Sequence, residues 1–227
     1  MPDASPAEAA PRIKIRIESL SDLVFGLALS LGAIALIQNL PQDSGHLTND
    51  VVLFAFSFLI IVGTWLGYTR IVSVLQVETP GALYLNLALL FCIALEPFLY
   101  YVFESADATF LNFSSAAFGL DIGSMWVLLA AMVFLLLRQE ANSKVPTLSP
   151  GLVRRFKISM VTQGIGGAVF AVSTLDVFWV QVPGYGFLRF LIWYFALAVV
   201  FSTRWAARVS SWREEKSITH QPPPHEP

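Results

Sequence analysis

Ionisable and hydroxyl-bearing side chains run directly into the first apolar stretch of the chain. Residues 16–22 read RIESLSD and include Arg16, Ser21 and Asp22, after which an apolar stretch begins. Charged groups at a membrane boundary are unfavourable unless they are paired, so this cluster indicates a functional role. A simple anchor on the cytoplasmic side is the other interpretation of Arg16.

The apolar stretch has a helical order of its own. Leu27, Leu31 and Ile34 share one helix face, and Gln38 continues the same row. A parallel stripe carries the small residues Ala28, Gly32 and Ala35. Small residues let helices approach closely in lipid, so the pattern suits a helix that lines a tight symmetric axis. An ordinary helix that faces lipid or a bundle would show the same spacing.

The composition requires a membrane protein around these residues. Apolar residues make up 56% of the chain and charged residues only 13%. A bilayer needs about 20 apolar residues per helix, and such segments occupy residues 20–40, 50–76, 81–104, 118–138, 154–180 and 186–207. We therefore predict an all-α polytopic membrane protein with six transmembrane helices. Its expected parts are an N-terminal cytoplasmic segment (1–15), a transmembrane domain (16–210) and a disordered cytoplasmic tail (211–227). Residues 107–117 are expected to be a loop or a short interfacial helix.

The basic residues are distributed asymmetrically. In a six-helix arrangement all of the 14 lysines and arginines except Arg189 fall on one side of the membrane. The positive-inside rule then predicts a multi-pass protein of the plasma membrane with both termini in the cytoplasm. The connections on the other side contain the acids Asp43, Asp50, Glu104, Asp107 and Asp121. These acids would concentrate cations near an opening, or they are ordinary solvated charges.

Motifs for enzymatic or nucleic-acid chemistry are missing from the sequence. The histidines His46, His220 and His225 fall in loops or the tail, and Cys92 is the single cysteine. We find no metal-ligand spacing and no phosphate-binding motif, so we predict no catalytic residues, no metal, no cofactor and no nucleic-acid partner.

One short stretch is similar to a carbonyl filter. Residues 182–187 read VPGYGF and are similar to the TVGYG loop of potassium channels. That loop needs a re-entrant pore helix before it. The fifth apolar segment is expected to continue to about residue 180, which leaves no room for one, so we predict a plain turn.

The first charged cluster resembles a family signature. RIESLSD resembles the Arg-x-x-x-Phe-Ser-Asp motif of the transmembrane protein 175 family of potassium channels, with Leu20 in the place of Phe. In the second apolar segment Ser57, Phe58 and Trp65 match the family spacing, and Tyr68 stands where His is common.

The third apolar segment agrees as well. Asn86, Pro97 and Phe98 match the family pattern, while Glu96 is a charged residue at a normally apolar site. The resemblance covers roughly residues 14–100. Glu96 would be a cation or proton site, or a protonated or paired residue of the helix bundle.

The resemblance implies a homotetramer in which the first helices surround a central pore. In that arrangement Leu27, Leu31 and Ile34 form the constriction and the selectivity element, flanked by the polar residues Ser30 and Gln38. The signature network would consist of Arg16, Ser21, Asp22 and Trp65. The implied function is a leak channel permeable to K⁺ over Na⁺, with K⁺ ions and the lipid bilayer as partners.

Two other functions stay open on the sequence. A proton or weakly selective cation pathway would use Glu96 and Asp176 as relay sites. A membrane scaffold that conducts nothing would have the same hydropathy.

Overall fold

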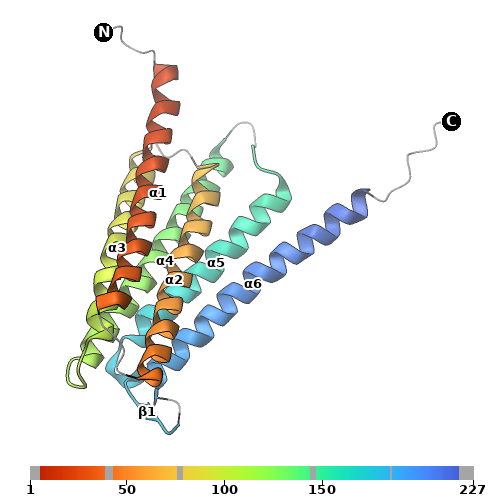
Figure 1. Ribbon diagram of the computed structural model, residues 1–227. Coiled ribbons are helices and arrows are strands. Elements are labelled where there is room, and N and C mark those ends of the chain that lie inside the picture. Colours follow the sequence, from red (N-terminus) through yellow and green to blue (C-terminus); the bar gives the residue numbers. More distant parts are fainter. Residues whose placement is uncertain (1–5, 39–42, 76–78, 144–146, 185, 220–227) are drawn as a thin grey trace, which may run out of the picture.

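The computed structural model describes residues 6–38, 43–75, 79–143, 147–184 and 186–219 (Figure 1). Within these residues the chain forms six α-helices, one 3-10 helix and a two-stranded hairpin. The elements are α1 (Pro6–Gln38), α2 (Ser44–Val72), α3 (Pro80–Glu104), α4 (Leu111–Asn142), α5 (Pro150–Ser173), η1 (Asp176–Phe178), β1 (Gln181–Val182), β2 (Gly186–Phe187) and α6 (Leu188–Thr219). The first five α-helices contain spans long and apolar enough to cross a membrane, and Leu188–Thr203 of α6 is a shorter apolar helix. The predicted all-α polytopic fold is confirmed.

Local capping chemistry explains where several helices begin. The Asp43 carboxylate accepts a hydrogen bond from the backbone N–H of His46 at the start of α2. Ser149 caps α5 in the same way by accepting from the N–H of Leu152. Prolines at the first positions of α3 and α5 need no hydrogen-bond partner there, because a proline has no N–H.

Successive helices run in alternating directions, so the start of α1 and the end of α6 lie at the same end of the molecule (Figure 1). The last part of α6 points away from the other helices. Arg70 near the end of α2 and Arg154 near the start of α5 belong to the end with the termini, whereas Arg189 at the start of α6 belongs to the opposite end. The fold therefore segregates these charges in the way a single membrane topology requires.

Aromatic rings fill the bundle near the end opposite the termini. Phe103 stacks on Phe118 with ring centroids 5.5 Å apart, and Phe170 stacks on Trp193 at 5.7 Å. These four residues join α3, α4, α5 and α6. Such ring pairs stabilise the fold beyond the area they bury.

α4 and α5 cross so closely that the contact requires glycine on both helices. A Cβ atom on Gly167 would lie 2.7 Å from the carbonyl oxygen of Gly123, and one on Gly123 would lie 2.9 Å from the oxygen of Gly167. Small residues of this kind bring helix backbones together in membranes, where packing takes the place of the hydrophobic effect.

Two predicted boundaries differ from the structure. α4 begins at Leu111, so most of the segment 107–117 is part of a long helix. α5 ends at Ser173 and not near residue 180. The helix can end there because the Arg189 guanidinium, contributed by α6, donates hydrogen bonds to the carbonyl oxygens of Ser173 and Thr174 at 2.9 and 2.8 Å.

The filter-like residues form part of a small hairpin. β1 and β2 pair antiparallel, with Gln181 opposite Phe187 and Val182 opposite Gly186. Gly184 and Gly186 have φ angles of 78° and 80°, a region that favours glycine. In the described residues between α5 and α6, only η1 and this hairpin are present, so the predicted turn is confirmed and a re-entrant helix is absent there.

Both terminal segments are more helical than the sequence predicts. α6 is helical to Thr219, whereas the sequence places the start of a disordered tail at residue 211. Residues 220–227, with His220 and His225, lie outside the described residues, as does the side chain of Gln38. The expected N-terminal segment 1–15 is helical from Pro6 onward.

Candidate pore face

One face of α1 exposes a continuous row of large aliphatic side chains. Leu27, Leu31 and Ile34 are 53%, 51% and 47% exposed in the isolated subunit. The row continues in both directions through Leu20, Leu23 and Ile37. A contiguous apolar face of this length must be covered by lipid or by another protein surface.

The opposite face of α1 is buried against the same subunit. It packs on α2 and α3 and consists of Ser21, Phe25, Ala28, Gly32 and Ala35. A Cβ atom on Gly32 would already touch the Phe54 ring at 3.6 Å. The spacing suggested that the small residues flank the aliphatic row at a symmetric axis. In the structure they instead pack within the subunit. Packing leaves the aliphatic row uncovered.

The exposed face also carries polar groups. The Ser30 hydroxyl donates to the carbonyl oxygen of Gly26 at 2.8 Å and is exposed between Leu27 and Leu31. Arg16 lies on this face as well, because eleven residues of helix bring it within about 20° of Leu27. Its guanidinium forms no hydrogen bond or ion pair with any residue that the structure describes.

The signature acid links the first two helices. The indole Nε1 of Trp65 on α2 donates to Asp22 Oδ1 at 3.0 Å. Both side chains are exposed, so the pair lies at the edge of the bundle. Its hydrogen bond links α1 to α2 there.

A second, buried pair lies beside it. The Ser21 hydroxyl donates to the carbonyl oxygen of Ile17 at 2.8 Å and therefore accepts from the Tyr68 hydroxyl at 2.6 Å. Tyr68 also packs against the ring of Phe25, with centroids 5.7 Å apart. Tyr68 was not among the predicted network residues; its place at a position where His is common in the family was the available signal.

The structure thus brings together Asp22 with Trp65 and Ser21 with Tyr68, and it leaves Arg16 outside both pairs. The reason is helical geometry. Arg16 and Ser21 are five residues apart, so they point about 140° away from each other around the helix. Close to Arg16, Lys14 reaches α2 instead, donating to the carbonyl oxygen of Ser73 at 3.2 Å.

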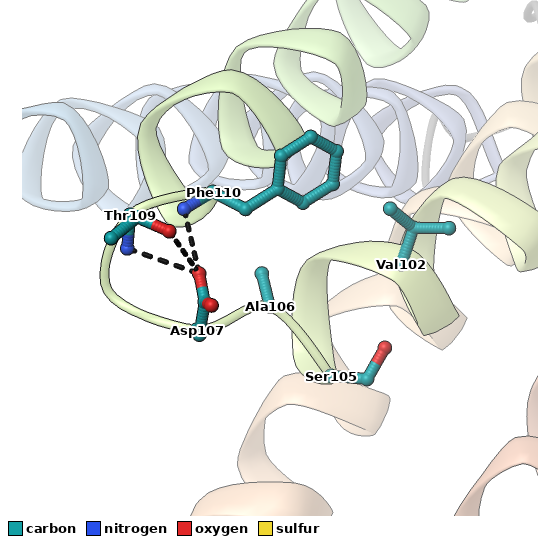
Figure 2. Close-up of a pocket in the computed structure, with 6 residues that line it drawn as sticks. All are labelled: Val102, Ser105, Ala106, Asp107, Thr109 and Phe110. Atoms are coloured by element: carbon teal, nitrogen blue, oxygen red, sulfur yellow. Dashed lines mark hydrogen bonds between the residues drawn. The ribbon is translucent and has the colours of Figure 1, made fainter.

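A shallow open hollow lies at the connection between α3 and α4 (Figure 2). Its central residue is Asp107, whose Oδ1 accepts from Thr109 N, Thr109 Oγ1 and Phe110 N at 3.1, 2.7 and 2.9 Å. These hydrogen bonds favour the carboxylate and hold the pKa of Asp107 below its ordinary value. The arrangement shapes the turn that starts α4.

The described parts of the chain contain no set of side chains that could bind a metal ion. No group of three or more His, Cys, Asp or Glu side chains is placed there to hold a metal ion. Asp176, which the sequence offered as a relay partner of Glu96, accepts instead from Asn112 Nδ2 at 3.0 Å and faces Arg189.

Comparison with known proteins identifies the segment that builds the candidate face. Residues 16–97 match the family model described as endosomal/lysosomal potassium channel TMEM175. No curated protein and no solved structure shows significant similarity to the chain. The matched segment runs from Arg16 on α1 to Pro97 on α3 and contains both hydrogen-bonded pairs. Residues 16–97 are therefore similar to the TMEM175 family of potassium channels.

Proposed function

We propose that four copies of this chain form a leak channel permeable to K⁺ over Na⁺, with the four α1 helices around the pore. The observation that carries the proposal is the uncovered row of Leu27, Leu31 and Ile34 within the family segment. A face that meets only lipid has no need of Arg16 and Ser30, yet both lie on it.

The proposed mechanism is a hydrophobic constriction. Four copies of Leu27, Leu31 and Ile34 make three stacked apolar rings, and a ring of this kind gates by losing or holding its water. K⁺ is larger than Na⁺ and gives up its water more easily, which favours K⁺ in a narrow apolar passage. Ser30 and Gln38 flank the rings with groups that can hold water.

The two hydrogen-bonded pairs have a positioning role in this account. Asp22 with Trp65 and Ser21 with Tyr68 fix the rotation of α1 on α2, and that rotation decides which side chains face the axis. Arg16, which is free of both pairs, lies at the cytoplasmic mouth. In this proposal both termini face the cytoplasm and the channel lies in the plasma membrane.

Ion flux into liposomes tests the function. Purified protein reconstituted into liposomes is expected to carry K⁺ down its gradient faster than Na⁺ under matched gradients. Equal rates for the two ions would support a weakly selective cation pathway. Absence of flux for both ions, with protein verified in the bilayer, would leave the scaffold as the better account.

A further inference from the structure

Two carboxyl groups are buried together in the core of the subunit. Glu96 on α3 is 0% exposed and Asp121 on α4 is 6% exposed. Ser57 on α2 donates to Glu96 Oε1 at 2.5 Å, and the Cys92 side chain lies close to the Asp121 carboxyl. The two acids lie close enough for their charges to interact.

Each acid keeps one oxygen without a hydrogen-bond partner. Glu96 Oε2 and Asp121 Oδ2 are both buried and unpartnered. One helical turn beyond Glu96, the Tyr100 hydroxyl is also buried and unpartnered, and it lies within electrostatic reach of Glu96. Burying a polar atom without a partner is unfavourable, so each of the two carboxyl groups is one hydrogen-bond partner short.

The charges around the two acids provide no cation. The titratable side chain of α2 near Glu96 and Asp121 is Asp50. Those of α3 are Cys92, Tyr100 and Glu104. None of these four side chains is basic. Among the described residues, the partners of Glu96 and Asp121 are Ser57, Cys92, Tyr100 and each other, and none of these carries a positive charge. On α6, Arg189 is occupied by Ser115 and by backbone carbonyl groups, and its acidic neighbour is Asp176. In the described parts of α1 and α5, charged side chains are confined to residues 14–22 and 154–157, at the end with the termini.

The donor set fits a proton better than a metal ion. Hard cations such as Ca²⁺ take about 6–8 oxygen ligands. Among the described residues, Glu96 and Asp121 offer one unpartnered carboxyl oxygen each, and the neighbouring thiol is a poor ligand for such ions. A proton needs one oxygen and turns a buried charge into a neutral group that can donate a hydrogen bond.

Access to the two acids is one-sided. Glu96 lies about 12 Å from the end of α3, as eight residues of helix separate it from Glu104. Tyr100 lies between them and interacts with Glu96, Glu104 and Asp50. Toward the termini the core is closed by the fully buried apolar residues Ile60, Leu89, Ile93, Met125 and Leu129.

We propose that Glu96 and Asp121 form a proton-binding site inside each subunit, connected through Tyr100 to the end of the bundle that carries the α3–α4 connection. The site lies between α2, α3 and α4, away from the exposed row of α1.

Infrared difference spectroscopy tests the site without relying on ion current. Wild-type protein at neutral pH is expected to show the carbonyl stretching band of a protonated carboxylic acid, shifted in D₂O. Glu96→Gln and Asp121→Asn, which preserve shape, should each remove intensity from this band, and Asp107→Asn, an exposed acid at the same end, should leave it unchanged. Tyr100→Phe should slow the exchange in D₂O severalfold.

The wild-type measurement keeps the proposal open to refutation even if a variant fails to fold. A wild-type spectrum without any protonated-carboxyl band would overturn it. So would a band that persists at full intensity in both variants, or one that exchanges at the same rate in Tyr100→Phe as in the wild type.

Discussion

The Ser21 and Tyr68 hydroxyl groups form a buried hydrogen bond that holds α1 on α2. Ser21→Ala should destabilise the protein by about 1–3 kcal/mol, because it leaves the buried Tyr68 hydroxyl without a partner. Thermal unfolding in detergent measures this loss.

Two further variants separate this explanation from a general effect of the substitution. Adding Tyr68→Phe to Ser21→Ala removes the second hydroxyl and should restore much of the stability. Ser30→Ala, on the exposed face, should have little effect, since the Ser30 hydroxyl bonds only within its own helix. If the double variant is as unstable as the sum of its single variants, the pair does not act as a unit.

At the scale of elements, the glycine contact between α4 and α5 leaves no room for a side chain. Gly167→Ala would place a methyl group 2.7 Å from the oxygen of Gly123 and 2.8 Å from the Val127 side chain. We expect a loss of about 1–3 kcal/mol, because close contact with backbone can be relieved only by moving a helix.

Gly164 is the matched control on the same helix. The nearest atom to a Cβ there is the Ala130 methyl at 4.0 Å. Gly164→Ala should be neutral or stabilising by up to about 1 kcal/mol, because alanine favours a helix over glycine. Similar unfolding temperatures for the two variants would argue against the close crossing.

The positions of the helices were predictable because apolar runs bounded by Thr79–Gly81 and Ser149–Gly151 are local signals. The end of α5 was not, because it depends on Arg189 from another helix. At the candidate pore face, local signals were again sufficient for part of the arrangement. The spacing of Leu27, Leu31 and Ile34 predicted a common face, and the family signature predicted contact between Asp22 and Trp65. The pairing of Ser21 with Tyr68 depends on how two helices meet, which the sequence of either helix does not reveal.

For the whole molecule, the segregation of basic residues predicts that both termini face the cytoplasm. Single cysteines at His46 and Glu215, in a chain whose Cys92 is replaced by serine, test this in intact cells. An impermeant thiol reagent should label position 46, which is exposed at the start of α2, and should not label position 215. Labelling of position 215 from outside would contradict a cytoplasmic C-terminus.

The central claim is that the exposed row of α1 lines a pore, and conductance of Leu27 variants tests it most directly. Leu120 on α4 is the matched control, because it is also 53% exposed but lies on another helix. It is a better control than Leu29, whose side chain points about 160° away from Leu27 but packs partly against the core.

We predict that Leu27→Asn raises single-channel conductance and lowers the preference for K⁺ over Na⁺, because four amides hold water in the ring. Leu27→Trp should block the current by filling the axis, and Leu120→Asn should conduct like the wild type. The account would be contradicted if both Leu27 variants conducted like the wild type, or if Leu120→Asn changed selectivity as Leu27→Asn is expected to do.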